Sequence, residues 1–336
     1  MSPIALTRRR VLLGGVGLLA YSGTAYWSIT ERIMRAEVPL YGETVAFGGG
    51  GSREIVPVGR VDAVVPGTRV LADRVQTAAL LEEEQAWLAS CAPWVQTRLD
   101  AGDDVLRSAL LDLRALSADL KVSVAGWTDR WRYAWPRDVS FVAAALARVG
   151  HHDAAADQLR WLRGVQGRDG GFEARYDPST RRPPDDRVAQ LDGTGWVVWG
   201  AAQIAAQAPE RATELLIRKH FGPTPIGPTE ADVEVLTAID RAQTSMLRPA
   251  GGLAPGASWK NDGISWTPTT ALFAAAWAAN GYPTKAEILL KWLGDHRTEA
   301  GSYPEKVLHD GRPAAVAPLA WTASLVVIAT HELVRA

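Results

Sequence analysis

The residue pattern from Gln76 onward is helical, and the connections between the predicted helices alternate in character. Some connections are tight and contain a glycine that ends a helix, at Gly150 and Gly281. Others are long and rich in Trp, Asp, Glu and Lys, and span 119–137, 166–189, 248–266 and 295–316. The predicted helices lie near 76–91, 103–118, 138–149, 152–165, 190–206, 209–219, 229–247, 267–279, 283–294 and 317–334. Short turns at one end and long loops at the other predict stacked α-hairpins, with the functional site at the long-loop end.

We expect residues 76–336 to form an all-α domain in which the hairpins close into an α/α toroid of the six-barrel type. About ten helices make about five hairpins, so the predicted ring is incomplete by one helix pair. The apolar content of 47% is enough for a sizeable core. A net charge of -1 does not favour nucleic acid as a partner, and the single Cys91 excludes an internal disulfide framework and a thiolate zinc cluster.

Residues 1–30 resemble a twin-arginine signal or a membrane anchor. Arg8, Arg9 and Arg10 precede an apolar run over 11–20, which has the length of a signal peptide's apolar region. Adding 22–27 brings the run to the lower edge of membrane-spanning length, and no clean cleavage site follows. We expect export by the twin-arginine route, with retention as an N-terminal membrane anchor favoured slightly over cleavage and release. The alternative is a buried N-terminal helix.

Residues 31–75 form a linker with short β-segments in this interpretation. Short β-branched runs at 55–58 and 61–65 are broken by the glycines of 48–51 and by Pro66-Gly67. This pattern predicts a small β-hairpin or two, or an extended stalk between membrane and domain. The glycine run lacks the following helix that a phosphate-binding loop requires.

The loop 126–138 combines rigid aromatic side chains with fixed charges, and a predicted helix follows at once. Its aromatic residues include Trp127, Tyr133 and Trp135, and it ends in Arg137-Asp138. Aromatic faces cover the apolar C–H face of a pyranose, and Arg–Asp pairs hydrogen-bond its hydroxyls. The loop therefore predicts the floor of a sugar-binding pocket. The alternative is that the aromatics belong to the core and the charges form a structural ion pair.

Several segments, in the order in which they occur, carry a family resemblance over roughly residues 103–334. The segments are Trp131–Asp138 with Gly150-His151 behind it, Asp169-Gly170-Gly171-Phe172, Gln190–Trp196, Trp259–Gly263 with Ser265-Trp266-Thr267-Pro268, and Pro304-Glu305-Lys306 with Pro318-Leu319-Ala320-Trp321. Together they resemble the glucoamylase family of glycoside hydrolases, family 15. The resemblance implies an α/α six-barrel and inverting hydrolysis of α-glucosidic bonds in an oligosaccharide or disaccharide, with no cofactor.

The same resemblance implies a role for individual residues. Arg137 and Asp138 would hold sugar hydroxyls in the deepest subsite, with Asp192 as a further contact and Lys260 as a basic residue of the late loop. The aromatic walls would come from Trp127, Tyr133, Trp135, Trp259 and Trp266. Glu305 would be the general base, so we expect Asp138 and Glu305 on one rim. The alternative for Glu305 is a surface pair with Lys306.

The chain departs from the family at the general acid. Inverting hydrolysis needs a second carboxyl, roughly 6.5–9.5 Å from the base. The family's acid is the first Glu of a Trp-Glu-Glu-like motif, and no Trp-Glu pair occurs between Asp192 and Trp259. Glu173 and Asp262 are the candidate replacements. Each has an alternative: Glu173 pairs with Arg175 or Arg168, and Asp262 caps the turn before Gly263.

Two other functions remain open at this stage: a non-catalytic carbohydrate-binding relative on the same fold, and an α-hairpin scaffold that binds a protein partner. The loops are rich in Trp, Arg and Asp, which favours sugar over protein, whereas the missing acid favours binding over turnover. No metal site is predicted, because His151 and His152 lie in a tight turn with no further ligand at helical spacing.

Overall fold

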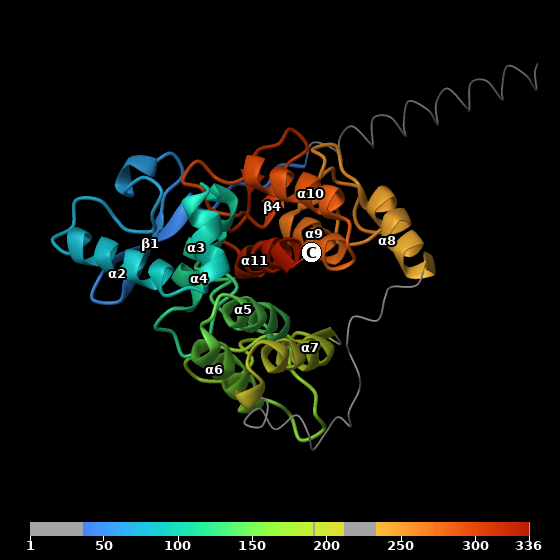
Figure 1. Cartoon of the computed structure of the whole chain (residues 1–336), viewed down its shortest axis with the longest axis horizontal. Coiled ribbons are helices and arrows are strands. Elements are labelled where there is room, and N and C mark those ends of the chain that lie inside the picture. Colours follow the sequence, from blue (N-terminus) through green and yellow to red (C-terminus); the bar gives the residue numbers. More distant parts are fainter. Residues whose placement is uncertain (1–35, 191, 212–232, 336) are drawn as a thin grey trace, which may run out of the picture.

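The computed structural model describes residues 36–190, 192–211 and 233–335, and this part of the chain contains ten α-helices and two small β-sheets (Figure 1). The helices are α2 (Thr77–Ala89), α3 (Pro93–Asp100), α4 (Asp104–Ser117), α5 (Pro136–Arg148), α6 (His152–Arg163), α7 (Asp192–Gln207), α8 (Val233–Met246), α9 (Thr267–Ala279), α10 (Pro283–Asp295) and α11 (Ala320–Arg335). The 3-10 turns are η1 (Val61–Ala63) and η2 (Pro209–Arg211). The predicted signal or anchor at 1–30 and most of the predicted helix 209–219 lie outside the described residues.

Local sequence sets most helix ends. The Asp103 side chain accepts a hydrogen bond from the Leu106 N–H at 2.9 Å and so caps α4. Pro136 and Pro283 occupy the first turns of α5 and α10, where a missing N–H costs nothing. Gly150 and Gly281 adopt φ of 91° and 78° after α5 and α9, which confirms the predicted glycine caps.

The described helices differ from the predicted ones at two places. The sequence pattern did not predict α3, which has only eight residues and buries one apolar side chain, Val95, so its periodicity is weak. The predicted α-helix from residue 209 begins as the 3-10 turn η2, Pro209–Arg211.

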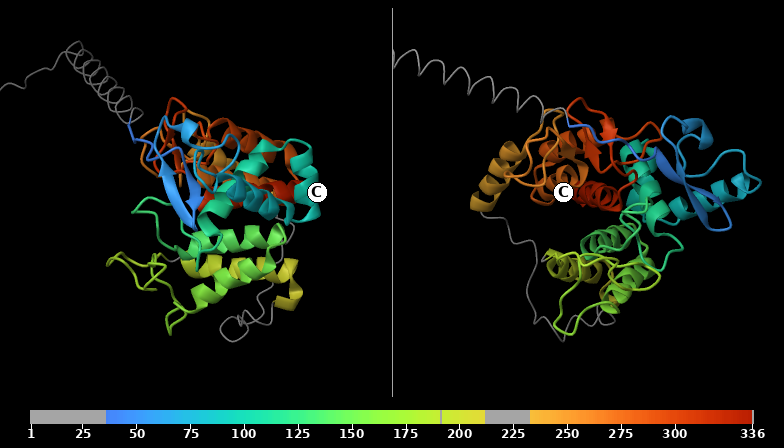
Figure 2. Two further views of the ribbon diagram at one scale, coloured as in Figure 1. Left: turned by 90° about the vertical axis from the view of Figure 1, so that its left-hand side faces the viewer. Right: turned by 180° about the vertical axis from the view of Figure 1, so that it is seen from behind.

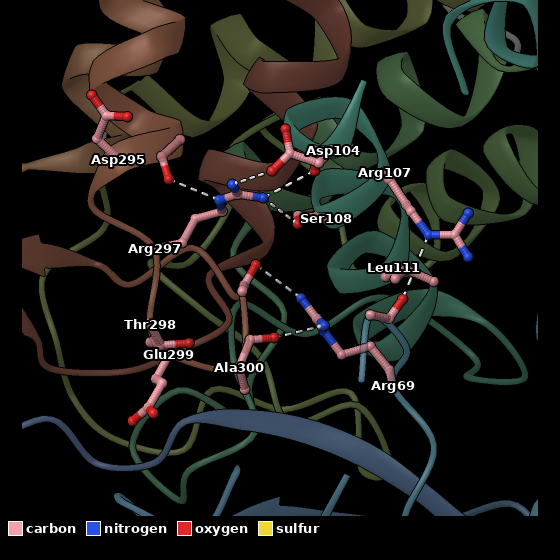
Figure 3. A pocket seen from close by; sticks show the side chains of 13 residues that line it. Arg69, Asp104, Arg107, Ser108, Leu111, Asp295, Arg297, Thr298, Glu299 and Ala300 are labelled. Atoms are coloured by element: carbon pink, nitrogen blue, oxygen red, sulfur yellow. Dashed lines mark hydrogen bonds and ion pairs between the residues drawn. The ribbon is translucent and has the colours of Figure 1, made fainter. Parts of the chain in front are cut away.

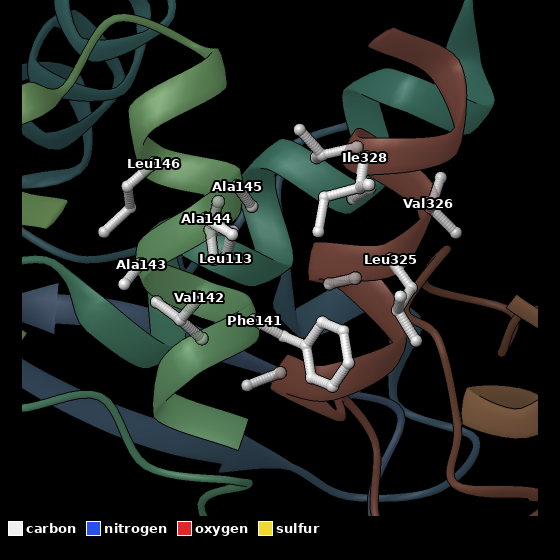
Figure 4. Packing of buried hydrophobic residues seen from close by; sticks show 14 of the residues in the cluster. Leu113, Phe141, Val142, Ala143, Ala144, Ala145, Leu146, Leu325, Val326 and Ile328 are labelled. Carbon is white, nitrogen blue, oxygen red and sulfur yellow. The ribbon is translucent and has the colours of Figure 1, made fainter. Parts of the chain in front are cut away.

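The centre of the helical body is the packing of α11 against α4, α5 and α9. Phe141 of α5 and Leu325 and Ile328 of α11 are buried in this interface (Figure 4). The tight turns at Gly150 and Gly281 join α5 to α6 and α9 to α10 as packed pairs. The long loops all leave from the other end of these helices, as predicted.

A cavity beside α7 and α9 bears on the expected shortage of helices. Between α7 and α9 lies a largely apolar cavity of about 510 Å³, lined among others by Trp196, Trp199, Leu272 and Leu325. The described residues place no helix pair there. The helix between them in sequence, α8, lies instead against α9 and α10, where the Trp277 indole donates to Gln243 at 2.5 Å.

Two small sheets join segments that are distant in sequence. Strands β1 (Thr44–Gly49) and β2 (Ser52–Val56) form an antiparallel hairpin (Figure 2), the hairpin alternative of the prediction. Phe47 of β1 packs with Leu80 and Ala115 of the helical body. Strands β3 (Ser265–Trp266), β4 (Lys306–Val307) and β5 (Pro313–Ala314) form a sheet in the order β3-β4-β5. This second sheet pairs Trp266 with Lys306.

A buried ion pair connects the hairpin region to the loop before β4. The Arg69 guanidinium donates to Asp112 of α4 at 2.8 Å. It also donates to the carbonyls of Ala300 and Gly301 at 3.1 Å (Figure 3). The same Asp112 carboxylate accepts from the Ser302 hydroxyl at 2.7 Å and the Tyr303 N–H at 2.8 Å. The loop that leads to Glu305 is thus hydrogen-bonded to Arg69 through two of its carbonyls and to Asp112 through Ser302 and Tyr303.

Within the described ranges, no helix combines the length and apolar character needed to cross a bilayer.

Candidate functional site

A cavity of about 620 Å³ opens among the long loops, at the N-terminal ends of α5, α9 and α11. Its volume lies within the range of about 300–1,000 Å³ that is usual for small-molecule sites. Its described lining residues are Ala125, Arg130, Trp131, Trp135, Arg137, Asp138, Arg175, Arg187, Gln190, Trp259, Trp266, Pro268, Glu305, Leu319 and Trp321. Asp138 and Glu305 are therefore brought to one cavity, as expected.

The first turn of α5 sets the position of Asp138. Trp135 is extended, Pro136 starts the helix, and Asp138 is buried with 4% of its surface exposed. The Arg137 guanidinium lies 3.1 Å from the Asp138 carboxylate and 4.2 Å from the centre of the Trp321 ring system. Burial raises the pKa of Asp138, and the positive charge of Arg137 opposes that rise.

Arg137 also connects α5 to the start of α7. Its guanidinium lies 3.3 Å from the Asp192 carboxylate and donates to the Gln190 amide oxygen at 3.3 Å. Asp192, a predicted sugar contact, is thus placed beside Arg137 at the edge of the cavity, although it is not among the lining residues.

Glu305 is held by backbone hydrogen bonds next to the second sheet. Its N–H donates to the Val316 carbonyl at 2.8 Å, and its carbonyl accepts from the Thr267 N–H at 3.1 Å. Its carboxylate lies 3.4 Å from the Lys306 ammonium and 3.5 Å from the Trp131 indole N–H. The pair with Lys306 therefore exists, but only 9% of the Glu305 surface is exposed, so this is not a surface pair.

The pKa of Glu305 is raised above the ordinary glutamic acid value. Burial is the main cause, and the negative charge of Asp138 adds to it, whereas Lys306 and the Trp131 indole act in the opposite direction. A carboxylate with a raised pKa accepts a proton more readily than an exposed one. The ionised form of Glu305 is therefore more basic than that of an exposed glutamate.

The two candidate acids do not reach the cavity. Glu173 is exposed, because its segment turns it outward while Phe172 and Ala174 are buried. Asp262 accepts a hydrogen bond from the Ile264 N–H at 3.1 Å across Gly263, which has φ of 74°. Asp262 thus makes the turn of the alternative interpretation. Neither residue is among the lining residues.

Three residues implied by the resemblance also lie outside the cavity lining. The Trp127 indole donates to the Arg53 carbonyl at 3.2 Å, so this side chain contacts the hairpin instead. Tyr133 lies behind the wall, where it packs on Trp135 with ring centres 6.1 Å apart. Lys260 is exposed on the loop after Trp259. Trp135, Trp259 and Trp266 do line the cavity, as predicted.

Several lining residues were not selected from the sequence. Trp131 and Trp321 stand inside the quoted segments, and a preference for aromatics at the start of a helix at the long-loop end would have found both. Arg175, Arg187 and Gln190 come from the long loop 166–189 and its continuation, where no periodicity shows which polar side chain turns inward. In the described ranges, no group of three or more His, Cys, Asp or Glu side chains converges as a metal site.

Comparison with solved structures finds similar folds at low identity. A wild-type glycosidase matches with a TM-score of 0.53 and 18% identity, covering 70% of this chain and 98% of that one. A variant glycosidase in complex with glucose matches with the same TM-score, identity and coverage. A bacterial glucoamylase complexed with acarbose matches with a TM-score of 0.50 and 14% identity, and the match covers 77% of this chain but 59% of the glucoamylase.

Neither a protein-family description nor a curated protein matches this sequence. The described chain is mostly helical, and its α/α fold is similar to that of glycosidases, a bacterial glucoamylase among them.

Proposed function

We propose that this protein binds an α-glucoside in the cavity and hydrolyses it with inversion, with Glu305 as the general base. One observation carries the proposal: Asp138 and Glu305, which are far apart in sequence, are both buried in one cavity that has tryptophan walls. Glycosidases of similar fold have been obtained with glucose and with acarbose, which supports a carbohydrate ligand.

In this proposal each part of the cavity has its own task. The Arg137–Asp138 pair offers donors and acceptors in a fixed arrangement that suits sugar hydroxyls. The tryptophans, such as Trp135 and Trp266, cover the C–H faces of the sugar. Glu305 takes a proton from water as the water oxygen bonds to the anomeric carbon and the glycosidic C–O bond breaks.

A second function is favoured by one feature of the site. The leaving oxygen needs a proton, yet Asp138 is the only carboxylate besides Glu305 among the described lining residues. Burial raises the pKa of Asp138, but its carboxylate is already engaged by Arg137 at 3.1 Å, which opposes that rise. A carbohydrate-binding protein without turnover would need no acid, so it is the second candidate.

Maltose hydrolysis by the wild-type protein and by the Glu305→Gln variant separates these functions. We expect the variant to lose about 10²–10⁴-fold in rate, the usual contribution of a general base, while it still binds maltose. The matched control is Glu299→Gln, which changes an exposed carboxylate in the same connection between α10 and β4.

Each other outcome has a clear meaning. Equal turnover in wild type and Glu305→Gln would refute the role of Glu305. Binding of maltose, followed by tryptophan fluorescence, without any turnover would favour the carbohydrate-binding protein. No fluorescence response at millimolar sugar would leave the third alternative, a scaffold for a protein partner.

We also propose that residues 1–30 direct export by the twin-arginine route and keep the protein at the membrane or release it outside. The support is the arginine-flanked apolar run alone. Fractionation of the native host tests this proposal, and an intact chain in the soluble cytoplasm would refute it.

A further inference from the structure

The lining of the cavity is unevenly charged. Its described residues include Arg130, Arg137, Arg175 and Arg187, against the carboxylates Asp138 and Glu305. Each of the two carboxylates has its own cation, Arg137 for Asp138 and Lys306 for Glu305. The other three arginines of the lining have no buried carboxylate of the lining as a partner. The protein as a whole has a net charge of -1.

These remaining arginines, Arg130, Arg175 and Arg187, gather on the side of the cavity formed by the loops 126–135 and 166–190; we call them the arginine rim. Arg175 donates to the Arg130 carbonyl at 2.9 Å, and its guanidinium lies 4.4 Å from the centre of the Tyr133 ring. Packing thus fixes Arg175, whose side chain is 10% exposed. Arg130 and Arg187 are exposed. Arg130 and Arg187 therefore lie at the mouth of the cavity, whereas Arg175 is buried, as are Asp138 and Glu305.

The described carboxylates do not balance the arginine rim. Arg175 and Arg187 share one carboxylate oxygen of Asp185, at 2.5 Å and 3.6 Å. No described ion pair or side-chain hydrogen bond engages the Arg130 guanidinium. This holds although Asp129 precedes Arg130 in the sequence, as Asp186 precedes Arg187. In the described ion pairs the three guanidinium groups of the rim therefore share one carboxylate, that of Asp185.

We propose that the arginine rim binds an anionic group, a carboxylate or a phosphate, on the part of the glycoside that extends from the buried floor to the mouth. This inference rests on the proposed function and names its substrate class: an acidic α-glucoside whose charge lies on the aglycone. Planar guanidinium groups match the geometry of both anions and bind them in bidentate fashion. A neutral maltooligosaccharide would leave these charges without a partner.

Two pairs of probes test the proposal, and the two members of each pair differ only in one acidic group. Maltobionate and maltitol are both 4-O-α-glucosides of an open six-carbon chain, and they differ in a carboxylate against a hydroxymethyl group. Trehalose 6-phosphate and trehalose provide the same comparison for a phosphate. Dissociation constants would be measured by calorimetry on full-length Glu305→Gln protein, so that no probe is consumed. We expect the acidic member of at least one pair to bind about tenfold more tightly at low salt, and this preference to shrink as salt is added.

Substitutions of the rim arginines test whether the rim causes the preference for the acidic probe. Arg187→Gln, alone and combined with Arg130→Gln, should remove most of the preference, measured as the ratio of the acidic to the neutral dissociation constant within each pair. Arg182→Gln is the matched control, because it removes the same charge from an exposed position of the same loop outside the lining.

The outcomes distinguish the inference from the function on which it rests. If neutral and acidic probes bind equally well, the anionic substrate is wrong and the carbohydrate site stands. If the preference survives Arg130→Gln/Arg187→Gln or disappears with Arg182→Gln, the rim is not the anion site. If none of the four probes binds, the proposed function fails, and the inference fails with it.

Discussion

The carboxylates of Asp138 and Glu305 lie close enough in one cavity that the negative charge of Asp138 raises the pKa of Glu305. Each carboxylate has a cation from the adjacent residue, Arg137 at 3.1 Å and Lys306 at 3.4 Å. Burial raises the pKa of both groups, and the two cations oppose that rise. This balance makes the neighbouring cations, and not only the carboxylates, targets for experiment.

Replacing Lys306 by Gln should move the acid limb of the activity profile to higher pH. The base works only when ionised, so the rate falls as pH falls through the pKa of Glu305. The ammonium of Lys306 lowers that pKa against the effect of burial, and its removal raises the pKa further. The measurement is kcat/KM for maltose against pH. A limb that stays in place would show that Glu305 does not control the rate.

Replacing Trp259 by Ala should weaken maltose binding about fivefold, which corresponds to about 1 kcal/mol for an aromatic contact. Trp259 lines the cavity, packs edge-on against Trp266 and is 41% exposed, so its loss should leave the fold intact. Titration calorimetry gives the affinity. Tyr282→Ala, at a similarly exposed aromatic that is not in the lining, should bind maltose normally.

Replacing Asp112 by Ala should destabilise the protein by about 3–5 kcal/mol, because the Arg69 charge then stays buried without its partner. The Ser302 hydroxyl and Tyr303 N–H lose their acceptor as well. Urea unfolding measures the effect. Asp62→Ala breaks the exposed pair with Arg60 and serves as the comparison, with no measurable change expected. Similar urea midpoints for the two variants would contradict the structural role of Asp112.

Replacing Glu332 by Gln should cost stability at neutral pH but not in acid. Burial alone would raise the pKa of Glu332, but its contacts with His331 and Arg148 lower the pKa to about 2. A depressed pKa in the folded state stabilises the protein above the unfolded value of 4.5, and this contribution disappears as pH falls toward 2.

Because solvent reaches part of this pair, we expect a loss of only about 2 kcal/mol at pH 7. Urea midpoints of wild type and variant, measured from pH 7 downward, should converge below the unfolded pKa. A difference that stays constant with pH would rule out the ion pair as its source. Glu82→Gln, at an exposed position of α2, controls for the loss of one charge.

The sequence predicted the helical body well, because its signals are local. Glycines at 150 and 281 and prolines at the starts of α5 and α10 act within one turn of where they stand. The strands β3, β4 and β5 were not predicted, since each has two residues and exists only through pairing with a distant segment. That sheet places Lys306 opposite Trp266, a contact that no local pattern contains.

The floor of the site and three of its wall tryptophans, Trp135, Trp259 and Trp266, were predicted, and the rest of its walls was not. Asp138 and Glu305 belong to short segments with a recognisable order, so their meeting in one cavity could be expected. The direction of Trp127, which bonds to the Arg53 carbonyl, depends on a hairpin that comes earlier in the chain. Asp262, in contrast, is held by its own local turn, in which its carboxylate accepts from the Ile264 N–H, as in the alternative that the sequence left open.

The attachment of the first hairpin to the loop before Glu305 bears on how the protein can be produced. A recombinant fragment that starts at Gln76, where the helices begin, would lack Arg69 and Glu43. Asp112 would then lose its cation, and the Thr298 hydroxyl and Glu299 N–H would lose their acceptors on Glu43. The segment that leads to Glu305 would lose these contacts with the first hairpin region. Expression trials should therefore retain the chain from residue 36 onward.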